Sequence, residues 1–240
     1  MIASHKLPAV CHSLPERSLP LFQQQANTLG KVLKKKLKSE LKNLCGVSDA
    51  LSTHVKEIYN ELLVDKDDDA IKVGVSRYNQ AALMFDGPAF RGLAASDLTP
   101  EEGQGLQKHL RILTGLYGYV KPGDLIQEHR LCMGTKLVVS DEQKDLYTFW
   151  GNQLAIEITS DLRNQLKNLK RDKKSTKKGD QMSSPVPLIV NCASQEYSKS
   201  VLPHLNTGDD GGDIRIVECV FLDDGIIKSA FAKRARGMDV

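Results

Sequence analysis

Residues 99–137 read T-P-E-E-G-Q-G-L-Q-K-H-L-R-I-L-T-G-L-Y-G-Y-V-K-P-G-D-L-I-Q-E-H-R-L-C-M-G-T-K-L, and the rest of the chain is interpreted outward from them. Thr99 stands at an N-cap position, with Pro100 at the first helical position and Glu102 at the capping-box position. Leucines then recur at helical spacing, which predicts a helix with one apolar face that ends at Gly115. The leucines of that face are Leu106, Leu110, Leu113 and Leu116.

The segment Gly115-Leu116-Tyr117-Gly118 is predicted to form a short hairpin between this helix and a second one that begins at Pro122. A helix, a G-h-x-G hairpin (h is an apolar residue) and a second helix form the pattern of helix-hairpin-helix DNA-binding motifs, so this element is expected over about residues 100–127. Glycines let the backbone approach a phosphate, and the free amide hydrogens and the positive helix end attract an anion, helped by Lys121. Such a motif contacts phosphates rather than bases. An ordinary helix–turn–helix corner with C-capping glycines fits the same pattern.

Composition places the chain among globular proteins. Its 240 residues can bury a sizeable core, and 40% apolar and 26% charged residues are ordinary for such a chain. The net charge is only +3, so an anionic partner must be inferred from local clusters of charge. The five cysteines are odd in number and lack C-x-x-C spacing, which argues against a zinc site and a disulfide framework and favours a reducing, cytoplasmic compartment. No apolar run approaches a membrane span, and no secretory signal is recognisable.

Helices and strands alternate in the predicted pattern. Helices are expected over 20–43, 48–63 and 147–169, and strands over 81–85, within 131–139, and at 187–190, 214–222 and 226–232. This predicts an α/β fold, or α+β, as a single compact domain over 20–240, with a mixed sheet built largely from the second half and flanking helices. Residues 1–19 are expected to be irregular, and the basic stretch at about 167–186 to be a flexible loop. The lysine run within 31–38 is interpreted as a solvated face.

A polar group follows the predicted strand at 187–190. It contains an amide, a hydroxyl, a carboxylate, a phenol and an amine within nine residues, which could form an acid–base site past the carboxyl end of a strand. An ion pair and a helix cap explain the same residues without catalysis. The five are Asn191, Ser194, Glu196, Tyr197 and Lys199. The six histidines are scattered, so no metal site and no cofactor are predicted.

Together, several blocks resemble the YaaA family of peroxide-stress proteins. The blocks occur in order along the chain: V-S-D-A-L (47–51), L-R-I-L-T-G-L-Y-G (110–118), R-L-C-M-G-T-K-L (130–137), L-Y-T-F-W-G (146–151), N-C-A-S-Q-E-Y-S-K-S-V (191–201), V-F-L-D (220–223) and F-A-K-R-A-R-G (231–237). The family pattern also has an opening strand with an S-P-A-K-T-L-like segment, and it continues beyond the last block. The chain is therefore expected to be incomplete at both ends.

The resemblance implies an α/β domain with a helix-hairpin-helix element and a positively charged cleft. It also implies a protein that binds duplex and branched DNA and limits iron-dependent DNA damage by hydrogen peroxide. The expected DNA contacts are Lys108, Arg111, Gly115, Tyr117, Gly118, Lys121, Arg130, Lys136, Lys199, Lys233, Arg234 and Arg236. The leading hypothesis is thus a non-catalytic, sequence-independent DNA-binding protein. The alternative is an enzyme that acts on a nucleotide, base or small anionic substrate through the 191–199 group.

Overall fold

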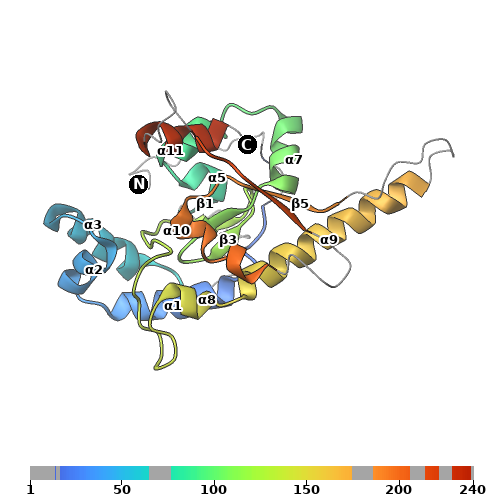
Figure 1. Ribbon diagram of the computed structural model, residues 1–240. Coiled ribbons are helices and arrows are strands. Elements are labelled where there is room, and N and C mark those ends of the chain that lie inside the picture. Colours follow the sequence, from blue (N-terminus) through green and yellow to red (C-terminus); the bar gives the residue numbers. More distant parts are fainter. Residues whose placement is uncertain are drawn as a thin grey trace. The chain divides into compact units, whose positions relative to one another are not determined.

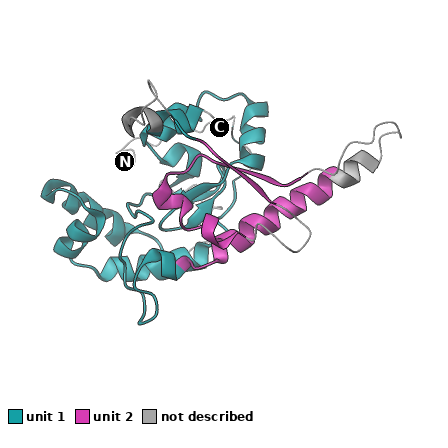
Figure 2. Ribbon diagram, in the orientation of Figure 1, with its two compact units in different colours: residues 1–149, 220–240 teal, residues 150–219 magenta. Residues whose placement is uncertain are grey.

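The structure is a computed structural model, and it describes residue 14 and residues 17–64, 77–174, 186–205, 214–221 and 229–238. The chain divides into two compact units (Figure 2), residues 1–149 with 220–240 and residues 150–219. Helices and short strands alternate, so the predicted α/β class is confirmed. The described strands form three two-stranded sheets, not one mixed sheet, and two of these sheets lie within residues 78–127. None of the described helices is long and apolar enough to cross a membrane.

The first unit opens with three helices, α1 (Gln23–Lys35), α2 (Lys38–Cys45) and α3 (Asp49–Glu61) (Figure 1). The single helix expected over 20–43 is wrong, because the chain breaks at Lys36-Leu37. The ammonium of Lys56 donates to the carbonyls of Lys34 and Lys36 and so ends α1. The Leu37 amide then donates to the Glu40 carboxylate at 2.7 Å and starts α2.

The lysine run is also more than a solvated face. The Lys34 ammonium donates to the carbonyls of Asn60 (3.0 Å) and Leu62 (2.7 Å) at the end of α3. Lysine side chains of α1 and α3 therefore satisfy the last carbonyls of each other's helix, which otherwise lack partners. This reciprocal capping fixes the two helices against one another.

Helix α7 (Pro100–His109) begins as predicted. The Glu102 amide donates to the Thr99 hydroxyl, and the Thr99 amide donates to the Glu102 carboxylate, which is the capping box. The helix ends six residues before Gly115, since Leu110 is already extended at ψ 138°. Leu113 and Leu116 are therefore not on its apolar face.

The helix-hairpin-helix predicted over 100–127 is wrong. The chain after α7 forms strands β2 (Ile112–Thr114), β3 (Gly118–Val120) and β4 (Leu125–Gln127). Strands β2 and β3 pair antiparallel, and Gly118, at φ +70°, closes the turn between them. Pro122 lies in a turn between β3 and β4, because the Lys121 amide donates to the Asp124 carboxylate at 2.8 Å.

The strand predicted at 81–85 is wrong as well. Strand β1 (Tyr78–Gln80) pairs antiparallel with β4, and the chain then turns into the short helix α5 (Ala81–Met84). The amides of Ala81 and Ala82 donate to carbonyls at Asp124 and Pro122, which holds this turn. Residues 131–139 form no strand, although buried and exposed side chains alternate along them as in one.

The second unit contains the long helix α9 (Gln153–Lys174), which follows α8 (Leu146–Trp150) after a break at Gly151, φ +50°. Residues 167–174 are thus helical rather than a flexible loop, and residues 175–185 lie outside the described part. Strand β5 (Leu188–Asn191) was predicted, and it pairs in parallel with β6 (Arg215–Glu218). However, β5 is not buried, since alternate residues along it are exposed. Short helices α10 (Gln195–Ser198) and η1 (Leu202–His204) lie between the two strands in sequence.

The strand expected at 226–232 is wrong where the structure describes it. Helix α11 (Ser229–Met238) starts there and packs against α6 (Pro88–Leu93) in the first unit. A side chain at Gly237 would overlap the Ala89 carbonyl, and one at Gly92 would overlap the Arg234 carbonyl. Glycine therefore lets the two helices touch backbone to backbone. Residues 222–228, which join the two strands expected at 214–222 and 226–232, lie outside the described residues.

Candidate nucleic-acid interface

The glycine corner at 115–118 lies in the core. Leu116 and Tyr117 are each only 1% exposed, and both glycines are buried. A Cβ at Gly115 would overlap the Leu131 carbonyl, so this glycine is needed for close backbone packing. A phosphate cannot reach these amides, and the prediction that Gly115, Tyr117 and Gly118 contact DNA is wrong.

His129 organises the polar contacts around this hairpin. It is 2% exposed; its Nδ1 lies 2.9 Å from the Gln127 carbonyl and its Nε2 lies 2.7 Å from the Thr114 hydroxyl. The carbonyl can only accept, so Nδ1 carries the proton and Nε2 accepts from Thr114. Burial lowers the pKa of His129 to about 4, against a small opposing effect of the Gln127 carbonyl. The imidazole therefore stays neutral, and its ring meets Tyr117 and Phe85 edge to face.

Gln127 completes this network. The side-chain amide of Gln127 both accepts from the Leu63 backbone N–H and donates to the Leu63 carbonyl, each at 2.8 Å. The backbone N–H of Gln127 donates to the Tyr117 hydroxyl at 3.1 Å. The stretch that sequence reasoning assigned to DNA is thus a hydrogen-bonded core that joins α3 to the strands.

The predicted cationic contacts are spread over several elements. Exposed ones are Lys108, Lys136, Lys199, Lys233 and Arg234, and half-buried ones are Arg111, Lys121, Arg130 and Arg236. The Arg111 guanidinium donates to three carbonyls at the end of α7, and that of Arg236 lies 5.8 Å from the Phe221 ring centre. Lys199 belongs to the second unit and the others to the first.

The five polar residues of the alternative hypothesis surround α10. Asn191 ends β5 and its side-chain oxygen accepts from the Ala193 amide at 3.1 Å, while Ser194 occupies the N-cap position of α10. Glu196 and Lys199 are exposed and Tyr197 is half-buried. The Asn191 side chain thus shapes the turn that leads from β5 into α10.

Sequence reasoning missed a second glycine turn, between α2 and α3. Gly46 ends α2 in the left-handed conformation at φ +59°, and the Val47 amide returns to the Lys42 carbonyl. The Ser48 hydroxyl accepts from the Leu51 amide at 3.4 Å and so caps α3. A side chain at Gly46 would meet no atom within 4 Å, and residues 48–50 are exposed. The first turn of α3 is therefore open to a ligand.

Two lysines of α2 flank this turn. The ammonium groups of Lys42 and Lys38 lie 3.3 and 3.7 Å from the carboxylate of Asp49, the first residue of α3. The hydrogen bond from Lys42, with the charge of Lys38, holds the Asp49 pKa below its usual value. Two positive charges face one negative charge here, so an excess of positive charge remains beside the exposed residues of the turn.

Buried contacts hold the α2–α3 turn in place. The Cys45 thiol (3.1 Å) and the Tyr59 hydroxyl (2.7 Å) both donate to the Arg130 carbonyl, and Tyr59 is fully buried. The Ser52 hydroxyl donates back to the Asp49 carbonyl at 2.6 Å. These hydrogen bonds therefore fix the position of the exposed turn.

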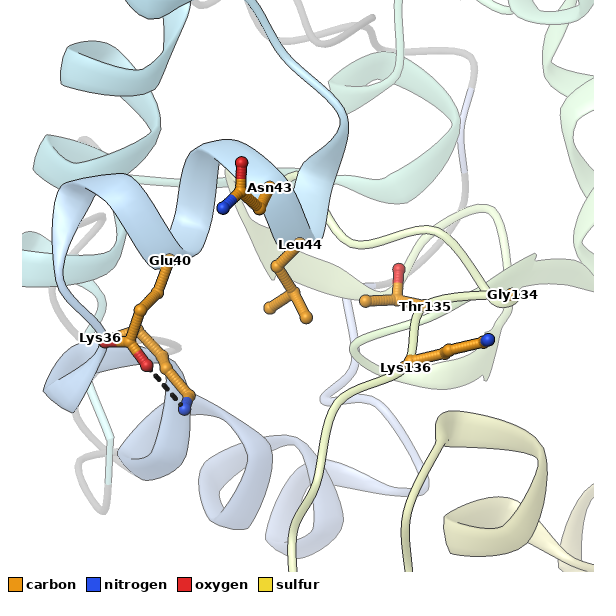
Figure 3. Close-up of a pocket in the computed structure, with 7 residues that line it drawn as sticks. All are labelled: Lys36, Glu40, Asn43, Leu44, Gly134, Thr135 and Lys136. Atoms are coloured by element: carbon orange, nitrogen blue, oxygen red, sulfur yellow. Dashed lines mark hydrogen bonds and ion pairs between the residues drawn. The ribbon is translucent and has the colours of Figure 1, made fainter.

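A pocket of about 460 Å³ lies beside α2 (Figure 3). Leu44 of α2 and Thr135 of the facing segment point toward one another, and Lys36 is paired with Glu40 at 3.0 Å. The exposed Lys136 also lines the pocket, but its ammonium group points away from α2. The remaining lining residues are Asn43 and Gly134.

The sequence does carry a signal for the α2–α3 turn. Gly46 precedes the apolar Val47 and the capping Ser48, with lysines one turn upstream. A search for glycines at both ends of the turn selects 115–118 instead, because Asp49 stands where the second glycine would be.

Comparison with known proteins agrees with the resemblance of the sequence blocks. A family model described as peroxide stress protein YaaA matches residues 3–240. A UPF0246 protein of Ruegeria pomeroyi is 35% identical over 222 residues, which are 91% of this chain and 74% of that protein. A UPF0246 protein of Burkholderia thailandensis is 34% identical over 235 residues, 96% of this chain and 77% of that protein. Within the described ranges, no three His, Cys, Asp or Glu side chains gather as a metal site would require. The chain belongs to the YaaA family of peroxide-stress proteins.

Proposed function

We propose that this protein binds duplex and branched DNA without sequence preference, as part of a cell's response to peroxide. The observation that carries the proposal is the exposed glycine turn between α2 and α3, flanked by Lys38 and Lys42. The proposal keeps the predicted partner and moves its binding site away from residues 115–118.

The physical basis is the anion preference of a helix N-terminus. The first amides of α3 have no carbonyl within the helix to which they can donate. The aligned peptide dipoles also place partial positive charge at this end of the helix. A phosphate oxygen could approach because Gly46 and the exposed residues 48–50 leave room. The two lysines of α2 supply the full charges that dominate affinity for DNA. Because only the backbone of the DNA is contacted, sequence would matter little.

Asp49 is the counter-argument within the site, and it makes the proposal testable. Its carboxylate competes with a phosphate for Lys38 and Lys42. The side chain is 73% exposed, so it can swing aside when DNA arrives. Removal of its charge should therefore tighten DNA binding, whereas removal of either lysine charge should weaken it.

Fluorescence anisotropy with a labelled duplex at low salt tests this directly. We expect Lys42→Gln to weaken binding several-fold and to reduce the slope of log K against log salt by about 0.9, the value for one lost phosphate contact. Asp49→Asn should shift the affinity in the opposite direction. The matched control is Lys108→Gln, because Lys108 is an exposed lysine that lies on α7. Equal effects of Lys42→Gln and Lys108→Gln would refute the assigned site.

The proposed benefit to the cell is that bound DNA is shielded from iron-dependent damage. Nicking of a plasmid by ferrous iron and peroxide should then fall with added wild-type protein. Lys42→Gln should protect less at the same concentration, in proportion to its weaker binding. Equal protection by both proteins would show that the protection does not depend on DNA binding.

A further inference from the structure

Two cysteines meet at the ends of the parallel strands β5 and β6. The sulfur atoms of Cys192 and Cys219 lie 3.8 Å apart, although the residues are 27 positions apart in the sequence. Asn191 pairs with Glu218 in the register of the two strands, so the cysteines are the next residues opposite one another. Both side chains are half-buried, and both are thiols.

The positions suit a covalent bond between the two sulfurs. Neighbouring strands lie about 4.8 Å apart, which is within the range of Cα separations that a disulfide spans. Both cysteines lie just beyond the paired residues of their strands, so their side chains can rotate without breaking the ladder. The Cys219 amide donates to the Asn191 carbonyl at 3.1 Å and keeps the two chain segments together. Only a small movement of the sulfurs is required.

We propose that Cys192 and Cys219 form a peroxide-oxidised dithiol, a redox site that reacts with hydrogen peroxide to give an intramolecular disulfide. In the first step, one thiolate attacks the peroxide O–O bond, which yields a sulfenic acid and releases hydroxide. In the second step, the other thiol attacks the sulfenyl sulfur and displaces its oxygen as water. Overall, two thiols are oxidised to one disulfide, and one peroxide is reduced to two water molecules.

The arrangement favours this pair over Cys45. The Cys45 thiol donates to the Arg130 carbonyl, and burial, together with the nearby Cys132, raises the pKa of Cys45 to about 11. A thiol that rarely ionises reacts slowly with peroxide. Cys192 and Cys219, by contrast, each have a second sulfur at hand that captures a sulfenic acid before further oxidation.

The test uses the purified, fully reduced chain and one equivalent of hydrogen peroxide. Remaining thiols are alkylated, and the protein is digested without reductant for mass spectrometry. We expect a peptide pair joined through Cys192 and Cys219, while Cys45 is recovered as the alkylated thiol. Recovery of both cysteines as alkylated thiols, or as separate sulfinic acids, would overturn the proposal. So would a disulfide that joins two different molecules.

A second measurement captures the intermediate. In Cys192→Ser and in Cys219→Ser the second thiol is absent, so in at least one of these variants the remaining cysteine should accumulate as a sulfenic acid that a dimedone probe labels. The matched control is Cys45→Ser, which should form the Cys192–Cys219 disulfide at the wild-type rate. Loss of the disulfide in that control would show that Cys45 takes part and would overturn the assignment to two residues.

Discussion

The protein should lose stability as the pH falls from 7 to 4, and His129 should account for a large part of the loss. In the folded protein burial lowers the pKa of this imidazole to about 4, from its usual 6.5. The unfolded chain takes up the proton near pH 6.5, and the folded protein does so only near pH 4. Between these values the unfolded state binds more protons, so the free energy of unfolding decreases as the pH falls.

The magnitude follows from the pKa difference. Each pKa unit is worth about 1.4 kcal/mol, so a pKa that falls from 6.5 to about 4 contributes about 3 kcal/mol. This is a large fraction of the stability of an ordinary domain, about 5–15 kcal/mol. Asp124 acts in the opposite sense, because burial raises its pKa and favours the protonated, folded form at low pH. The His129 contribution must therefore be isolated by comparison with a variant.

Urea unfolding at several pH values between 4 and 7 measures the effect. His129→Asn removes the titrating group. Between pH 7 and 4 the free energy of unfolding of this variant should therefore decrease by about 3 kcal/mol less than that of the wild type. His109→Asn is the control, because it makes the same substitution at an exposed histidine at the end of α7. If wild type and His129→Asn show the same pH dependence, the imidazole is not buried and neutral as described.

Three further predictions follow from the structure. Gly115→Ala should destabilise the protein by about 1–3 kcal/mol through overlap with backbone, whereas Gly105→Ala, in open space on α7, should stabilise it by up to about 1 kcal/mol, both measured by urea unfolding. Oxidation of Cys192 and Cys219 should stabilise the second unit by up to about 3.5 kcal/mol, the value expected for a closed loop of this length, and thermal unfolding with and without reductant would detect it. If the 191–199 group is catalytic, Glu196→Gln should abolish turnover of a nucleotide substrate while DNA affinity persists, and unchanged turnover would reject the enzyme hypothesis.

Signals that act within one turn of chain were predicted well. Thr99 and Glu102 were identified as a helix cap because the capping hydrogen bonds join residues three apart in sequence. Long-range contacts were not predictable in this way. The break at Lys36-Leu37 depends on Lys56, which lies twenty residues further along the chain.

The error at 115–118 has the same origin. A glycine pair around two larger residues fits a turn between helices and a turn between strands equally well. The choice is made by contacts with residues beyond the turn, including Leu131 behind Gly115 and His129 beside Tyr117. The exposure of Gly46 likewise depends on packing, so the sequence does not reveal which of the two glycine turns faces the solvent.

Amide hydrogen exchange with and without duplex DNA tests the central claim most directly. Bound phosphate should slow the exchange of amides in residues 46–51, which include the exposed first turn of α3. Residues 112–120 are buried except for the half-buried Leu113, so the exchange of their amides should not respond to DNA. Protection of 46–51 alone, weakened in Lys42→Gln, is the predicted result. Protection that appears at 112–120, or that leaves 46–51 unchanged, would contradict the account.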